Sequence, residues 1–542
     1  MRGILFRLNL IIGWVTLVMV GAVLGAPSAW AQPQDEAELP EAFRATFPIY
    51  SEALGPFTRA ISTSSSDAQA YFDQGFQLMY AFAKMEAARS FREAWKLDPN
   101  CAICYWGEAW AWGSYLNGPI REEDAPHAYA AIQKAMALAS DHATPTEQAF
   151  IGAMSVRYVE DYDPEERVKQ DEAYAEAMRL VAEEFPDDLD AVTLYADALF
   201  LLEPRRGTRD LNDPRVQRLH AVLEGILARN LKHPGACHLY IHATESTTAP
   251  EKAEACAEHL GFAIPGASHI NHMPSHTWNE VGRWGDGVRS NLMAWHSDQK
   301  AEFGKGFAIY PSHNLHMLLF AASMDGQGAV AIQAGKDYAK VTGDGLYHAL
   351  TLLRFGRFDE ILQLVEGRSE NNELSAGLWD FAQGYAHLRG GERDFAEVYL
   401  RRVLEVADTS EDTLRNHDAT HLLGIVGHIL EGELHRDAGD DEAAIASFET
   451  AVALEDALTY DEPEPLPFSA RHWLAAVLLD TERYAEAEQV YRDELSDHPH
   501  NGWSLFGLKA AIEAQRESSP EVDADLKASW ARSDIWLRAS RF

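Results

Sequence analysis

Histidine is concentrated in one part of this sequence, where its spacing could support metal chemistry. Ten of the 22 histidines lie between positions 233 and 316, and the centre of that stretch reads HINHMPSH over residues 269–276. Side chains three or four residues apart share one face of a helix, so imidazoles at such spacings can approach a common point. Similar spacings recur on both sides of this motif, in His242 with Glu245 and in His313 with His316.

The pattern predicts a transition-metal site built from three neighbouring helix pairs. Imidazole nitrogens with one carboxylate suit zinc, copper, iron or nickel, and suit calcium or magnesium poorly. The expected cofactor is zinc, copper or iron, and the spacing does not select among them. The candidate ligands are His242, Glu245, His269, His272, His276, His313 and His316. Four other histidines are left out because their spacing gives no face shared with these: His233, His238, His259 and His296.

Pro274 interrupts the spacing between His272 and His276. Proline is tolerated in the first turn of a helix because its missing N–H would have no partner there. We therefore expect a helix to begin at or near Pro274, with His272 in the segment that enters it.

The same histidines are also compatible with two roles that need no metal. They could line a polar groove that recognises a peptide or small ligand, or they could hydrogen-bond to backbone carbonyls and acids within the core. A single histidine in a helix more often has the second of these roles. Ten in one stretch favour a shared role.

A second polar group lies nearer the C-terminus. The segment YDEPEP over residues 460–465 precedes Arg471, and His417 and His421 are four residues apart. A turn and a solvated loop are the favoured interpretation. In the alternative, this segment faces the concave surface and contacts a ligand, and the candidate ligand-binding residues are Asp461, Glu462, Arg471 and Asn314.

Repeats of the tetratricopeptide (TPR) type predict the elements that position these residues. The aromatic, Gly, Ala, Phe, Ala and Pro positions of such a repeat appear in register as Tyr71, Gly75, Ala87, Phe91, Ala94 and Pro99. Partial copies recur as Ala487, Tyr491 and Pro499 and as Ala444, Phe448 and Ala451. The sequence therefore predicts an all-α, TPR-like α-solenoid of antiparallel helix pairs with a concave inner face.

The helical pattern continues between these copies. We expect helix pairs at 146–158 with 167–184, 189–202 with 214–230, 235–246 with 250–261, 270–282 with 285–299, 312–324 with 328–341, and 376–389 with 393–407. The expected organisation is a signal peptide (1–31), an extended segment (32–66), N-terminal repeats (67–230), His-rich central repeats (231–345), C-terminal repeats (346–515) and a C-terminal helix or tail (516–542).

The first 31 residues have the pattern of a secretory signal peptide. Arg2 and Arg7 precede an apolar run over residues 8–25, and an Ala-Trp-Ala cleavage pattern ends at Ala31. We expect an exported protein, periplasmic or secreted, without a membrane span after cleavage. An uncleaved N-terminal anchor is the alternative.

Four cysteines are consistent with that compartment. Cys101 and Cys104 form a C-x-x-C, while Cys237 and Cys256 stand apart. In an oxidising compartment an even number most often forms disulfides, and a Cys237–Cys256 bridge would tie one helix pair together. Free or redox-active thiols and thiolate metal ligands remain alternatives. Haem attachment is excluded because Tyr105 stands where histidine is required.

Charge limits the partners. The chain has 46 basic and 84 acidic residues and a net charge of −38, which argues against nucleic acid or an anionic membrane as a ligand. Motifs for serine hydrolases, zinc proteases, nucleotides and dinucleotides are absent from the sequence.

Three phrases together resemble an exported bacterial family of TPR proteins of about this length: LDPNCAICYWG at 97–107, HMPSH at 272–276 and NGWSL at 501–505. The resemblance extends from about residue 67 to residue 515. It implies the repeat fold and export, and it brings no activity. The chain departs from the family at Lys84, where the family often has histidine.

Repeats of this kind usually bind other molecules. The sequence therefore favours an exported scaffold that binds a protein, peptide or small ligand in its groove, with the metal site as an addition. The alternative is a metal-dependent enzyme, an oxidase or hydrolase, whose site is built from His242, Glu245, His272, His276, His313 and His316.

Overall fold

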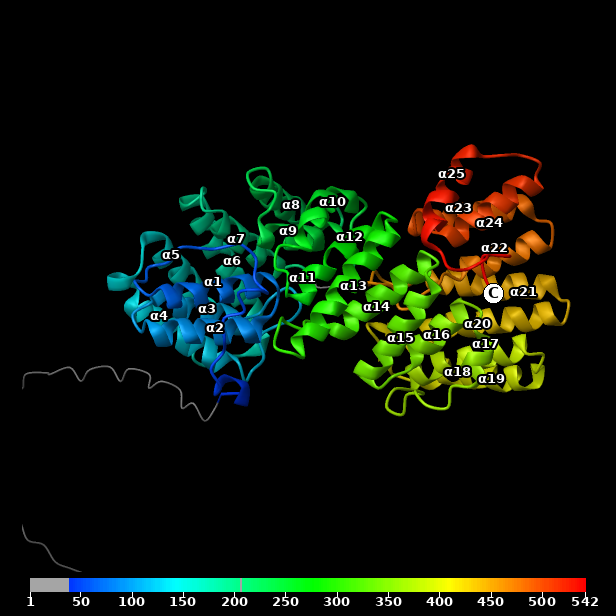
Figure 1. The fold of residues 1–542 in the computed structure, drawn as a ribbon, viewed down its shortest axis with the longest axis horizontal. Helices are drawn as coiled ribbons and strands as arrows, with labels where there is room; N and C mark the ends of the chain where they lie inside the picture. The colour runs from blue at the N-terminus through cyan, green and yellow to red at the C-terminus, as the bar shows by residue number, and fades with distance from the viewer. Residues whose placement is uncertain (1–38, 205–206) are drawn as a thin grey trace, which may run out of the picture.

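The computed structural model describes residues 39–204 and 207–542 (Figure 1). The predicted signal peptide at 1–31, and the first residues of the segment after it, lie outside the described residues. Within the described part, regular structure is almost entirely helical, and consecutive helices pack against one another as a TPR-like α-solenoid. Among the described helices, none has the length and apolarity that a membrane span requires.

The first ten α-helices run from one end of the elongated molecule toward its middle, drawn in blue to green in Figure 1. They are α1 (Ser66–Tyr80), α2 (Lys84–Leu97), α3 (Ala102–Trp112), α4 (Ala125–His142), α5 (Pro145–Ser155), α6 (Arg167–Glu184), α7 (Leu189–Phe200), α8 (Pro214–Leu227), α9 (Pro234–Thr244) and α10 (Glu254–Leu260), with the 3-10 helices η2 (Glu41–Phe43), η3 (Pro164–Glu166) and η4 (Pro250–Ala253).

Four helices occupy the middle: α11 (Ser268–His272), α12 (Pro274–Glu280), α13 (Trp284–Ala301) and α14 (Pro311–Met324). The other end holds α15 (Gly328–Thr342), α16 (Leu346–Arg354), α17 (Phe358–Leu362), α18 (Glu373–Arg389), α19 (Arg393–Thr409), β1 (Thr413–Leu414), β2 (His417–Asp418), α20 (Ala419–Asp437), α21 (Asp441–Glu455), α22 (Arg471–Asp480), α23 (Tyr484–Asp497), α24 (Gly502–Ala514), α25 (Pro520–Ser529) and η5 (Trp530–Arg532).

The expected helix pairs agree with most of these bounds. The expected helix at 270–282 is divided into α11 and α12, because Pro274 begins α12 as its position predicts. The expected pairs assign no helix to several segments, among them 125–142, 346–362 and 419–437, where the structure forms α4, α16, α17 and α20. The antiparallel two-residue strands β1 and β2 were not expected, since two residues are too few to give an alternating pattern.

The repeat signature has a direct packing basis. The ring of Phe91 fills the space between α1 and α3, where a Cβ at Gly75 would lie 2.8 Å and one at Gly107 would lie 2.5 Å from the nearest ring atom. The aromatic side chain therefore requires glycine on both neighbouring helices. Tyr491 against Gly507 repeats this arrangement near the C-terminus.

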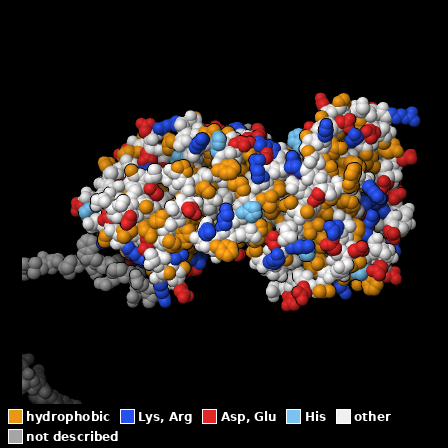
Figure 2. All heavy atoms as spheres, viewed as in Figure 1, with side chains coloured by type: hydrophobic (Ala, Val, Ile, Leu, Met, Phe, Trp, Pro, Cys, Tyr) orange, Lys and Arg blue, Asp and Glu red, His pale blue; other side chains and the backbone are white. Residues whose placement is uncertain are grey.

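Buried apolar side chains form two cores. The first runs from Leu39 to Ile309 and the second from Trp284 to Val522, so they overlap in sequence across α13 and the segment between α13 and α14. Figure 2 shows the molecule narrowing between its two ends, with acidic and basic side chains interspersed on this face. The middle helices α11–α14, which carry most of the HINHMPSH region, therefore lie where the two cores meet.

Two disulfides pair all four cysteines. Cys101 bonds Cys104 at the start of α3, and Cys237 in α9 bonds Cys256 in α10. The second bridge ties one helix pair together, as the sequence predicts, and it fixes α9 directly beside its histidines.

We predict that Phe91→Ala lowers the free energy of unfolding by about 3–5 kcal/mol. The substitution leaves a cavity between α1 and α3, and the facing residues Gly75 and Gly107 have no side chain that could fill it. The matched control is Phe395→Ala, whose side chain is 56% exposed, and it should change stability by less than about 0.5 kcal/mol. Chemical denaturation followed by circular dichroism measures both. Equal effects of the two variants would contradict the packing role of Phe91 between the repeats.

Candidate metal centre

Six imidazole rings from four helices form one continuous cluster. His238 and His242 come from α9, His269 and His272 from α11, His276 from α12, and His313 from α14. Neighbouring ring centroids lie 4.6–6.3 Å apart throughout the set. The cluster divides into two groups of three, and in each group one nitrogen per ring lies within 4.8 Å of the other two.

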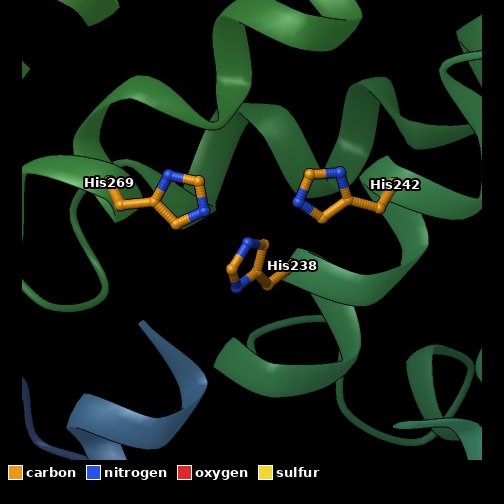
Figure 3. A group of neighbouring side chains, drawn as sticks. All are labelled: His238, His242 and His269. Atoms are coloured by element: carbon orange, nitrogen blue, oxygen red, sulfur yellow. The ribbon is translucent and has the colours of Figure 1, made fainter. Parts of the chain in front are cut away.

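His238, His242 and His269 form the first group, and their rings point toward one another in Figure 3. The Nδ1 of His238 lies 2.6 Å from the Tyr80 carbonyl oxygen. A carbonyl can only accept, so this nitrogen carries the hydrogen and Nε2 keeps its lone pair. The Nδ1 of His242 is likewise 2.9 Å from Glu245 Oε1. The Nε2 atoms of both rings, and both nitrogens of His269, are buried without a hydrogen-bond partner among the described residues.

His272, His276 and His313 form the second group. Asn291 donates its amide to the Gly287 carbonyl and presents Oδ1 to His272 Nδ1 at 3.1 Å. The lone pair of His272 is therefore on Nε2, which faces His276 Nε2 at 2.9 Å. The Nδ1 of His276 is occupied by carboxylates. A proton or a metal ion must therefore separate the two facing Nε2 atoms, because two lone pairs at this distance repel.

Glu245 joins the two groups. It is the C-cap residue of α9, and its two oxygens contact different histidines. Oε1 lies 2.9 Å from the Nδ1 of His242, and Oε2 lies 2.6 Å from the Nδ1 of His276. Glu462 Oε2 adds a second carboxylate at 3.0 Å from His276 Nδ1. A carboxylate that accepts from the outer nitrogen of a histidine fixes the ring and directs its other nitrogen toward a metal.

Glu462 reaches the cluster because the C-terminal end of the molecule holds its loop in place. Arg415, between β1 and β2, ion-pairs with Asp461 and donates to the backbone carbonyl of Glu462. Burial alone would raise the pKa of Asp461, but His417 and Arg415 together hold it below its usual range. The favoured interpretation of residues 460–465 as a solvated loop is therefore wrong for Asp461 and Glu462, which are buried, and Glu462 contacts the histidine cluster.

Burial sets the protonation of most of the cluster. It lowers the pKa of His238, His269, His272 and His313 well below the usual value, and the neighbouring histidines lower it further. These rings are therefore neutral, which is the form that binds metals. His276 differs: burial lowers its pKa, but Glu245 and Glu462 outweigh burial and raise it to about 10.

Aromatic side chains in a strained backbone conformation enclose the first group. Phe82 and Tyr310 have φ values of 60° and 56°, a left-handed region that bulky residues rarely occupy. The Phe82 ring lies 4.2 Å from that of His238, and the Tyr310 ring lies 5.2 Å from that of His269. Arg415, at 63°, is strained in the same way beside Asp461. Such strain concentrates at functional sites, where the surrounding structure enforces it.

Lys84 lies next to Tyr115, which in turn contacts Tyr310. Its ammonium group donates to the Gly113 carbonyl and stands 4.6 Å from the centre of the Tyr115 ring. The hydroxyl groups of Tyr115 and Tyr310 are 2.6 Å apart. Burial lowers the pKa of Lys84 to about 7. The contacts of Lys84 named here are with Gly113 and Tyr115, and none of them is with a histidine of the cluster.

Among the predicted site residues, His316, Asn314 and Arg471 are not members of either histidine group and make other contacts. His316 stacks on Tyr347 at 4.2 Å, with Nδ1 3.3 Å from Arg415 Nη1. Asn314 donates to Asp298 and to the Ile309 carbonyl, and so fastens α14 to α13 and the loop between them. Arg471 pairs with Asp456 and Asp497.

His238 is a member of the cluster that the interpretation of the sequence wrongly leaves out. We excluded it as sharing no face with the other histidines, yet it precedes His242 by four residues on α9 and contacts both His242 and His269. The i,i+4 spacing could have identified it. Glu462 was expected among ligand-binding residues, and its contact with His276 spans 186 positions of sequence, which no local pattern reveals.

Comparisons with known proteins show no family for this chain. No protein-family model matches it, and no curated protein matches it. Similar solved structures include the TPR domain of P58(IPK), 12% identical over 84% of this chain and 100% of that chain, with a TM-score of 0.22. Human IFIT1, as a dimer with m7Gppp-AAAA, is 12% identical over 94% and 97%, with a TM-score of 0.30. The APC/C hetero-tetramer Cut9-Hcn1 is 13% identical over 88% and 78%, with a TM-score of 0.29.

We predict that Glu245→Ala destabilises the metal-free protein by about 3 kcal/mol or more, because His276 and His242 lose a buried partner together. Denaturant unfolding in the presence of EDTA measures the change. Glu449→Ala, at an exposed position of α21, removes the same charge and should be nearly neutral. Indistinguishable results for the two variants would show that Glu245 does not hold α9 to α12.

Proposed function

We propose that this protein is a helical-repeat scaffold that binds two transition-metal ions, one at each group of three histidines. The observation that carries the proposal is the set of buried imidazole nitrogens with no partner among the described residues: His238 Nε2, His242 Nε2 and both nitrogens of His269. A buried polar atom left without a hydrogen bond costs about 1–3 kcal/mol. A metal ion between these rings would compensate that cost.

The donor chemistry fits zinc, copper or iron. His238, His242 and His269 would hold the first ion, and His272, His276 and His313 the second. His276, which Glu245 and Glu462 keep protonated, would release its Nε2 proton when the second ion binds. Three imidazoles leave a coordination position open, which a catalytic or ligand-exchanging site requires. Glu245 would act through His242 and His276 as the shared orienting carboxylate, instead of the direct ligand that its spacing suggested.

A mixed set shares some of the same side chains. In this set each residue also has one donor atom within 4.8 Å of those of the others, and its members are His242, Glu245, His276 and Glu462. A metal bound to these carboxylates would compete with the hydrogen bond of Glu245 to His242 and with the ion pairs of Glu245 and Glu462 with His276. The two all-histidine groups leave those bonds intact, so we favour them.

The test is the metal content of the full chain after loading with zinc or copper and exhaustive dialysis. We expect about two ions per chain, since there are two groups of ligands. His272→Ala/His276→Ala should lose the ion of the second group. His259→Ala/His296→Ala removes two exposed histidines and should retain both ions. Metal-free wild-type protein with intact helicity, or an equal loss in the control, would refute the proposal.

Two single variants in the same experiment test the composition of the site. His238→Ala should lose the first ion, because it removes one of three ligands of that group. His316→Ala should keep both ions, because His316 contacts Arg415 and Tyr347 instead. The opposite result would restore the ligand set expected from sequence spacing.

The alternative function is a metal-dependent enzyme of the oxidase or hydrolase class. One observation favours it: a cavity of about 410 Å³ is lined by His276 and Glu462 and so adjoins the second group. A substrate there could reach an open coordination position. Turnover by the metal-loaded protein that is absent from His272→Ala/His276→Ala would distinguish this function from metal binding alone.

Export is part of the proposal and is supported by the sequence of residues 1–31. The pairing of all four cysteines is consistent with an oxidising compartment. A protein or peptide partner in the concave groove is likewise proposed from the repeat architecture, since stacked repeats create extended binding surfaces.

A further inference from the structure

The cavity beside the second histidine group has an unusual charge composition. Residues from α12, α13, α14, α21, α22, α23 and the segment between α21 and α22 line its 410 Å³ volume. Seven carboxylates face one guanidinium and two imidazoles there. A volume of this size lies within the range of small-molecule sites, which is about 300–1,000 Å³.

Several of these carboxylates already have a cationic partner. His498 lies 3.1 Å from Glu464 and 3.0 Å from Glu494, and these acids raise its pKa well above the usual value, although burial opposes them. Arg415 pairs with Asp461. At the rim, Arg471 lies 2.7 Å from Asp456 and 3.5 Å from Asp497. The cations that line the cavity are therefore already engaged with other acids.

Two glutamates in the cavity have no ion pair among the residues that the structure describes. Within residues 39–204 and 207–542, Glu280 makes neither a hydrogen bond nor an ion pair, and Glu455 accepts only from Ser469 Oγ and the Ala470 N–H. Burial, together with Glu464, raises the pKa of each to about 8. Asn279, only 7% exposed, also lines the cavity, and its Oδ1 has no partner in the described part of the chain. These acceptors lack a matching positive charge or hydrogen-bond donor.

Apolar side chains complete the wall and decide which kind of cation fits. Trp284, Met317, Phe320 and Leu458 line the same space. A hydrated inorganic ion gains nothing from such a surface, whereas a hydrocarbon chain buries its apolar area there. Aromatic faces also attract an ammonium group.

We propose that this cavity binds a small organic polycation, an alkyl chain carrying two or three ammonium groups, with Glu280 and Glu455 as its main anionic contacts. The chain would lie along Trp284, Met317 and Phe320. Its binding does not require a metal, although the cavity wall includes His276 and Glu462 and a bound amine would lie beside the second metal group.

The test is calorimetric titration of spermidine into the full chain in EDTA, at an ionic strength of about 0.15 M to screen the surface charge. The use of metal-free protein separates this inference from the proposed metal function. We expect one site per chain. Glu280→Gln should weaken binding about tenfold or more, and Glu455→Gln should also weaken it, because each removes a buried contact with an ammonium group. The neutral analogue 1,8-octanediol should not bind measurably.

Glu449→Gln is the matched control, because it makes the same charge change at an exposed position of α21. It should leave spermidine affinity unchanged. Glu280→Gln should leave the melting temperature unchanged or higher, since it neutralises an acid without an ion-pair partner among the described residues, so loss of binding cannot be attributed to unfolding. No binding by the wild type, equal weakening by Glu449→Gln, or preferential binding of calcium chloride at the same site would each overturn the proposal.

Discussion

The contact on which the histidine site depends is the carboxylate of Glu245 between two imidazoles. Its two oxygens take His242 of α9 and His276 of α12. This arrangement sets which nitrogen of each ring carries the hydrogen, and the remaining Nε2 atoms are thereby turned toward the two groups of histidines. A single side chain at the end of α9 thus orients rings in both groups. Its desolvation is tolerated because both oxygens are occupied.

The scaffold allows so polar a cluster to be buried. The middle helices lie where the two apolar cores meet, so the rings are excluded from water by packing on both sides. Phe82 and Tyr310 close over the first group at the cost of a left-handed backbone. The Cys237–Cys256 disulfide fastens α9 beside these rings. Packing, strain and a covalent bond together hold imidazoles that would otherwise repel or become hydrated.

Charge organises the neighbouring cavity in a complementary way. The histidine groups are mostly neutral and present lone pairs, whereas the cavity next to them has carboxylates at Glu280 and Glu455 that form no ion pair within the described residues. Because α12 carries both His276 and Glu280, one helix contributes to both environments. A metal ion and an organic cation would be held side by side by different chemistry, the first by imidazole lone pairs and the second by carboxylates and aromatic faces.

The sequence by itself determined the helical repeats and most helix bounds, because periodicity, small-residue positions and proline act within a few residues of the chain. Phe91 between its glycines and the start of α12 at Pro274 are examples. It also located most of the clustered histidines. Only the tertiary structure decided which of them meet. His238 of α9 contacts His269 of α11, and His316 contacts Arg415. Glu462, from the segment between α21 and α22, contacts His276. Such contacts between helices depend on how each helix pair is rotated relative to the next. The spacing of residues within one helix carries no information about that rotation.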